Sequence, residues 1–317
     1  MTKLIKIPST LGHAEFDVLL EQQTGILLEG QHQGASEPLV FDFSENKSIS
    51  VLGILFIAKM ADKYKSVGYD CRVIPPKEKK SRWLISIMNL IKSEEKPKEM
   101  QKYWDTFRVP ILRCRNSKES LAAVNKLIPV IRNDMKPSDA VLKALNWALW
   151  EIVDNAGVHG YQMYESTGVD YSGTVYFCAA SLGENIDIAI IDGGQGIHSS
   201  FRSSGKEKYH GITNEEALKL STINSESGHP QGSPGFGLFG CSEIARAGKG
   251  QLLIVSGSNK LLLSEKGVII GPSLEYMGTM VSLRINRNAA INLLEIFGET
   301  SLVVNESINE LIGGIDE

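Results

Sequence analysis

The sequence has few cysteines, and their spacing does not suit a metal site. Its 317 residues include four cysteines, at positions 71, 114, 178 and 241, and no two of them lie within four residues of each other. The six histidines form no HExxH or HxxxH pair, so a metal held by protein ligands alone is not expected. We expect four reduced, mostly buried thiols, which fits a cytoplasmic location.

Long apolar runs and an excess of basic charge are also missing. The longest apolar run, Val51–Ala58, is far shorter than the roughly 20 residues of a membrane span, so no membrane contact is expected. Met1–Thr10 has no apolar core or small-residue cleavage site, so we expect no signal peptide. The net charge of −4 excludes a global basic field for nucleic acid.

Changes in composition along the chain predict two domains and an α+β fold. The expected segments are a small unit at residues 1–76, a basic helical linker at 77–110, a larger domain at 111–286 and a helical extension at 287–317. Within the linker, residues 77–108 hold nine Lys or Arg against five Asp or Glu. A solvated helical linker explains this composition, while a contact with nucleic acid or an acidic partner stays open.

The first segment has the pattern of a strand–helix–strand unit. Strands are expected at Leu4–Ile7, Gly25–Leu28, Leu39–Phe43 and Tyr69–Ile74, and a helix at Ile49–Val67. Ser48 or Ser50 is placed to cap that helix, and Gly68 is placed to end it.

The larger segment mixes long helices with strands. Helices are expected at Ser117–Asp134, where Pro129 would kink or end the helix, and from Ser138 to about Tyr161, with Ser117 and Ser138 as caps. Strands are expected at Ser172–Ser181, Ile186–Ile191, Gln251–Ser256, Leu261–Ser264 and Met280–Ile285. Residues 197–234 are expected to be a long loop with only a short helical piece near Asn214–Leu220, of the kind that often serves as a lid.

The stretch Asn146–Tyr161 carries the first candidate site. On a helix, Glu151 and Asn155 share one face, while an apolar stripe that includes Ile152 and Ala156 faces the core. An Asn carbonyl oxygen is a hard ligand suited to Mg²⁺. A neighbouring carboxylate can deprotonate a water or a hydroxyl.

A second motif follows an apolar strand, in the sequence Asp192-Gly193-Gly194-Gln195-Gly196-Ile197. Its glycines let the backbone approach a ligand closely. The carboxylate of Asp192 can accept a hydrogen bond from an exocyclic amine such as that of adenine.

Two glycine motifs come later in the chain. Gly232–Gly240 runs into a helix, and backbone amides at such a helix start form an anion site. This stretch is not a Walker P-loop, because no Lys-Ser/Thr follows the glycines at the required spacing. Gly278-Thr279 precedes a strand and offers a hydroxyl to a bound ring.

The order of these four motifs over Ala148–Ile285 resembles the GHKL ATPase superfamily, which includes gyrase-type topoisomerases, heat-shock chaperones, histidine kinases and mismatch-repair ATPases. The stretch EIVDNAGVHGY looks closest to the anti-sigma-factor serine kinase branch, in which E-x-x-x-N-A-x-x-H-G is typical. The resemblance implies binding of ATP and Mg²⁺, and a mixed sheet with helices on one face.

By this resemblance, Glu151 would be the general base, Asn155 would bind Mg²⁺ and Asp192 would read the adenine amino group. The other nucleotide-binding residues that it implies are Gly194, Gly196, Ile197, Gly235, Gly237, Leu238 and Thr279. Residues 39–76 are in turn similar to a STAS domain, the fold of anti-sigma-factor antagonists. Leu52 stands where such a domain has its phosphoacceptor, so this unit is interpreted as a docking or dimerisation platform.

Three functions stay open at this point. They are a slow ATP-hydrolysing switch gated by a lid at 197–234, a protein serine/threonine kinase, and a nucleotide-dependent assembly module without turnover. Glu151 favours the first two, since a protein that only binds nucleotide needs no base. A histidine kinase is disfavoured, because Ser117–Asp134 contains no His. A protein partner is expected, and a homodimer is one option.

Overall fold

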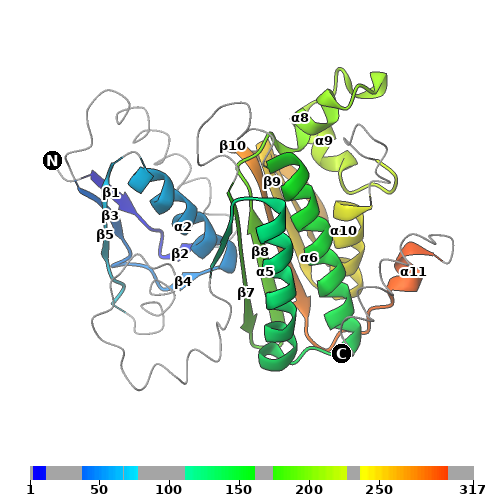
Figure 1. The fold of residues 1–317 in the computed structure, drawn as a ribbon, viewed down its shortest axis with the longest axis horizontal. Coiled ribbons are helices and arrows are strands. Elements are labelled where there is room, and N and C mark those ends of the chain that lie inside the picture. Colours follow the sequence, from blue (N-terminus) through cyan, green and yellow to red (C-terminus); the bar gives the residue numbers. More distant parts are fainter. Residues whose placement is uncertain are drawn as a thin grey trace.

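The computed structural model describes residues 3–11, 38–66, 68–77, 111–160, 174–226 and 236–298. Its elements form a small parallel sheet, a larger antiparallel sheet, and helices on both faces of the larger one (Figure 1). Helices and separate sheets of this kind confirm the α+β class. No helix in these ranges is long and apolar enough to cross a membrane.

The N-terminal part contains short strands and one long helix. Its elements are β1 (Lys3–Lys6), β2 (Thr10–Leu11), β3 (Pro38–Asp42), β4 (Ser48–Ile49), α2 (Val51–Ser66) and β5 (Asp70–Ile74). The main sheet has the order β1-β3-β5 with parallel pairings, as a crossover through a helix produces. The helix and three of the expected strands are confirmed to within about two residues. The strand expected at Gly25–Leu28 lies outside the described residues.

Local chemistry sets both ends of α2. Ser50 Oγ accepts a hydrogen bond from the Gly53 N–H at 3.1 Å, which confirms that a serine caps this helix. At the other end, Gly68 has a φ of 93°. The Tyr69 N–H then donates to the Tyr64 carbonyl at 3.0 Å, which closes the last turn.

The larger part contains a five-stranded sheet and its helices. It begins with β6 (Leu112–Cys114), α5 (Ser117–Val130), the wider helical turn η2 (Ile131–Met135), α6 (Asp139–Gly160), β7 (Val175–Leu182) and β8 (Asn185–Ile191). It continues with α8 (Gly196–Ser203), the short helix η3 (Glu207–Tyr209), α9 (Asn214–Leu220), α10 (Gly237–Ala247), β9 (Gln251–Ser264), β10 (Gly267–Asn286) and α11 (Leu293–Phe297).

The strand order of this sheet is β6-β7-β8-β10-β9, and its pairings are antiparallel. The expected mixed sheet is therefore wrong among the described strands. The reason is local, because β7–β8 and β9–β10 are hairpins, and a hairpin can only pair its strands antiparallel.

Helix caps are partly as expected. Ser138 Oγ accepts from the Val141 N–H at 3.3 Å and caps α6. The cap of α5 is Asn116 rather than Ser117, because the Asn116 side chain accepts from the Glu119 N–H at 2.9 Å. Pro129 does not end α5, because the helix continues to Val130 and widens into η2 only after it. Proline has no N–H, so one backbone hydrogen bond of the helix is missing near this end.

Two other segments are more regular than expected. The strands expected at Gln251–Ser256 and Leu261–Ser264 are one continuous strand, β9. Within residues 197–226, α9 confirms the short helical piece expected near Asn214–Leu220, whereas α8 and η3 stand where a loop was expected. Ile197 and Phe201 of α8 are buried four residues apart. The rest of that loop, linker residues 78–110 and extension residues 299–317 lie outside the described residues.

Both faces of the five-stranded sheet are covered, which differs from the one-faced arrangement that the resemblance implies. Along β7, Phe177 belongs to the core under α5, α6 and α10, whereas Tyr176 and Cys178 belong to the core under α2. Helix α2 is apolar on most of its surface, because it lies between the small sheet and the large one (Figure 1). The expected buried thiols are confirmed at 114, 178 and 241, and Cys71 is half-buried.

Candidate functional site

Helix α6 brings the first candidate pair to the surface of the core. Ile152 and Ala156 are buried, and Glu151 and Asn155 are partly exposed, as their spacing predicts. Both side chains lie against Gly237, the first residue of α10. A Cβ atom built on Gly237 would lie 2.6 Å from the Asn155 amide nitrogen and 3.1 Å from a Glu151 carboxylate oxygen. Only glycine therefore lets α10 begin this close to the pair.

Glu151 has the electrostatics of a proton acceptor that works near neutral pH. Burial raises the pKa of its carboxyl to about 7, and the neighbouring charge of Asp154 adds to the rise. A carboxyl group with this pKa can take up and release a proton at physiological pH.

Asp192 ends β8 and is fixed from several directions. Its Oδ1 accepts from the Gly194 N–H at 2.9 Å and from the Thr279 N–H at 3.2 Å. Its own N–H donates to the Thr279 carbonyl at 2.9 Å, which continues the pairing of β8 with β10. Burial raises the pKa of the Asp192 carboxyl, while Lys59 and the hydrogen bonds from Gly194 and Thr279 oppose that rise and favour the carboxylate.

Two glycines allow the backbone after Asp192 to pass close to the backbone at Gly278. Gly196 has a φ of 76°, and Gly278 has a φ of 110°, a region that L side chains rarely adopt. A Cβ on Gly278 would lie 2.4 Å from the Asp192 carbonyl oxygen. Between them sits buried Ser256, whose Oγ accepts from the Ile197 N–H at 2.9 Å and donates to the Gly278 carbonyl at 2.8 Å. Sequence reasoning missed Ser256, whose only signal is a polar residue at the end of an apolar strand.

A pocket that is open to solvent joins these groups. The predicted residues that line it are Asn155, Asp192, Gly196, Ile197, Gly237, Leu238 and Thr279. Glu151 lies beside it against Gly237, and Gly194 acts through its bond to Asp192. Gly235 lies outside the described residues.

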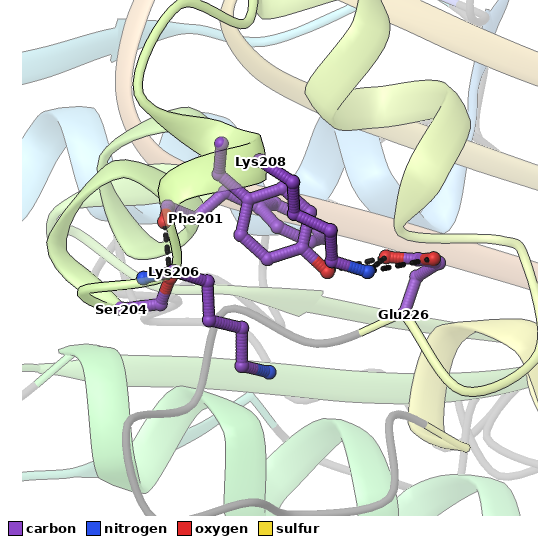
Figure 2. Close-up of polar contacts among 6 residues, drawn as sticks. Phe201, Ser204, Lys206, Lys208 and Glu226 are labelled. Atoms are coloured by element: carbon purple, nitrogen blue, oxygen red, sulfur yellow. Dashed lines mark hydrogen bonds and ion pairs between the residues drawn. The ribbon is translucent and has the colours of Figure 1, made fainter.

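The rim of the pocket includes Glu226, which sequence reasoning also missed. Figure 2 shows Lys208 reaching its carboxylate, with Lys208 Nζ 3.0 and 2.8 Å from the two oxygens. The Tyr209 hydroxyl donates to the same carboxylate, and its ring packs edge-on against Phe201, with 4.8 Å between the ring centroids. These contacts attach the segment after α9 to α8. Lys208, one of the basic residues of the expected lid, therefore faces Glu226 in this structure.

Lys59 and Tyr276 stand behind Asp192. Lys59 Nζ lies 2.7 Å from the Asp192 carbonyl oxygen and 2.6 Å from the Tyr276 hydroxyl. Lys59 comes from α2, and Tyr276 comes from β10. The sequence signal was a lysine within an apolar helix, which helical periodicity alone does not separate from a solvated position.

The donor set suits a hard cation that binds together with phosphate. Among the residues that the structure describes, no three His, Cys, Asp or Glu side chains gather into a metal cage. Mg²⁺ in nucleotide sites commonly has one or two protein oxygens, with phosphate and water supplying the others. Asn155, beside the start of α10, fits that pattern.

Comparison with known proteins adds no family. No model of a protein family matches this chain, and no curated protein matches it. The pocket and the four motifs are therefore the basis on which a function is inferred.

Proposed function

We propose that this protein binds Mg-ATP in the pocket between α6, α8, α10 and β10 and hydrolyses it slowly, as a conformational switch of the GHKL type. One observation carries the proposal. One pocket joins the buried carboxylate of Asp192, the base–amide pair of Glu151 and Asn155, and the helix start at Gly237, which come from three separate motifs.

The end at Asp192 suits a purine. Its carboxylate is an acceptor for the exocyclic amine of adenine, and Gly194 and Thr279 hold it in place. Apolar side chains beside it, such as Ile190 and Val281, line the space for the base. A site that pairs a buried acceptor with a donor on the ligand rejects analogues without that donor.

The end at Gly237 suits phosphates. Helix α10 begins there after Phe236, whose side chain offers no acceptor to the first N–H groups. Those groups and the positive end of the helix attract an anion. Bound Mg²⁺, held by Asn155, would neutralise charge that develops on the phosphates.

Glu151 is the residue that we assign to chemistry. It orients a water and accepts its proton while the water oxygen bonds to the γ-phosphorus. The bond from that phosphorus to the β–γ bridging oxygen breaks, and ADP carries away the electron pair. A pKa of about 7 allows Glu151 to release the proton afterwards.

A serine/threonine kinase is the second candidate, because the stretch from Glu151 to Gly160 is similar to the serine kinase branch. The residues would act in the same way, with a protein hydroxyl in place of water. A non-catalytic assembly module is the third reading, and it would leave Glu151 without a role in turnover.

One assay distinguishes these three proposed functions. The full chain is incubated with γ-labelled Mg-ATP, and free phosphate and protein-bound label are followed together. Asn155→Ala should abolish product formation, while Asp139→Asn, an exposed acid at the start of the same helix, should leave it unchanged. Label on the protein or on an added partner would favour the kinase. Binding without product would favour the assembly module, and no binding at all would overturn the proposal.

A further inference from the structure

Helix α2 carries one lysine into the contact between the N-terminal part and the five-stranded sheet. Its neighbours along the helix are buried apolar residues, among them Phe56 and Met60. Lys59 itself is partly buried, and burial lowers the pKa of its ammonium group to about 7. A lysine in such surroundings is costly unless its hydrogen bonds are made, so its partners indicate what it does.

Those partners form a closed triangle around one carbonyl. Lys59 Nζ donates to the Asp192 carbonyl oxygen at 2.7 Å and to the Tyr276 hydroxyl at 2.6 Å. The Tyr276 hydroxyl donates to the same carbonyl at 2.6 Å. Tyr276 is buried, and its ring packs against Phe56 of α2.

The triangle completes the fixation of Asp192. On the pocket side, the Asp192 N–H donates a hydrogen bond to Thr279 of β10, and its carboxylate accepts hydrogen bonds from Gly194 and Thr279. On the other side, the Asp192 carbonyl accepts a hydrogen bond from Lys59 of α2. The orientation of the carboxylate therefore depends on a residue that belongs to the N-terminal part of the chain.

We propose that Lys59 is a positioning residue for Asp192, through which the seating of α2 on the sheet and the recognition of the adenine amino group stabilise each other. This inference rests on the proposed function. Coupling of this kind is reciprocal, since a nucleotide that tightens Asp192 also tightens α2.

The test compares ATP with inosine triphosphate, whose base has a carbonyl oxygen in place of the 6-amino group and a proton on N1, and so offers no exocyclic amine. Dissociation constants of both nucleotides are measured on the full chain. Lys59→Met keeps length and apolar bulk, and we expect it to weaken ATP binding by about tenfold and to leave inosine triphosphate unchanged. A merely structural loss would weaken both nucleotides equally. Lys65→Met, an exposed lysine on the same helix, is the matched control and should change neither constant.

Two further variants keep the test decisive. Tyr276→Phe removes one donor to the carbonyl but keeps the ring, so it should lower the preference for ATP by about threefold even if Lys59→Met does not fold. Asp192→Asn gives the reference loss of preference for ATP, because it replaces the carboxylate that is proposed to bind the adenine amino group. If Asp192→Asn loses the preference and both other variants keep it, the positioning role is overturned while the proposed function stands. If the unmodified chain binds no ATP, or if Asp192→Asn keeps the preference, the proposed function fails and the inference fails with it.

Reciprocity gives a second readout. In the unmodified chain, ATP should slow hydrogen exchange of the backbone amides of α2, residues 51–66, more than inosine triphosphate does. In Lys59→Met this difference should disappear. Equal protection by the two nucleotides in the unmodified chain would contradict the coupling.

Discussion

The two ends of the pocket are built on different principles. At one end, Asp192 follows a strand, and hydrogen bonds from the sheet and from α2 fix its main chain and carboxylate. At the other end, Glu151 and Asn155 project from one helix towards the start of another, and Gly237 permits their close approach. The first end is a fixed acceptor, and the second is a junction of two helices.

Under the proposed function, this difference assigns recognition of the base to Asp192 and chemistry to Glu151. A carboxylate held from several sides costs little reorganisation when a ligand binds, which suits selection of a base. A carboxyl group with a pKa of about 7 suits proton transfer. Changes at Asp192 should therefore act mainly on affinity, and changes at Glu151 mainly on turnover.

The largest expected effect is that of Glu151→Gln. Removing the base should lower kcat by about 1000-fold, while the dissociation constant of ATP stays within about threefold, because the neutral side chain keeps the same shape. Steady-state phosphate release and equilibrium binding measure the two quantities. Comparable losses in both would show that the two ends do not divide the work.

Gly237→Ala should have the next largest effect. The added Cβ would lie 2.6 Å from the Asn155 amide, so either the Asn155 side chain or α10 must shift. Displacement of positioned groups by about 1 Å can cost about 100-fold in kcat/KM. Gly211→Ala is the matched control, since a Cβ there meets no atom within 4 Å. Equal activity of the two alanine variants would rule out a role for this approach.

The pH dependence of turnover should follow Glu151. Its carboxyl must be deprotonated to accept the proton of water, and its pKa is raised to about 7. The value of kcat should therefore fall as the pH drops below 7 and be about a tenth of its plateau at pH 6. The Lys59 ammonium has its pKa lowered to about 7, so the profile is recorded at saturating ATP, where effects on binding are removed. A flat profile down to pH 5 would exclude Glu151 as the base.

Ser256→Ala should have the smallest effect. It leaves the Ile197 N–H and the Gly278 carbonyl without their shared partner, which should cost about 1–3 kcal/mol of unfolding free energy. Loosening of the turn should also weaken ATP binding by about fivefold. Ser258→Ala, an exposed position on the same strand, gives the comparison in urea unfolding and nucleotide titration. A variant that unfolds and binds like the unmodified chain would remove Ser256 from the site.

Much of the site could be predicted because its residues act through their own chemistry. An acid and an amide four residues apart on a helix, an Asp before glycines and a glycine at a helix start are visible in one short window each. The pocket gathers them because β8 pairs with β10, a strand that is not consecutive with it in the chain, and this pairing brings Asp192 next to Thr279.

The residues that were missed act across long sequence separations. Ser256 joins β9 to the turns at Gly196 and Gly278, and Lys59 reaches a residue more than a hundred positions away. No local pattern encodes such contacts. The antiparallel direction of the β8–β10 pairing was missed for the same reason, since these two strands are not consecutive in the chain and their pairing depends on how the connections bring them together.

The central claim is that the Asp192 end of the pocket recognises adenine. Its most direct test is a calorimetric titration of the full chain with ATP in the presence of Mg²⁺, repeated with Asp192→Asn. We expect saturable binding to one site per chain and at least about tenfold weaker binding by the variant. No binding to the unmodified chain, or equal affinity of the two proteins, would contradict it.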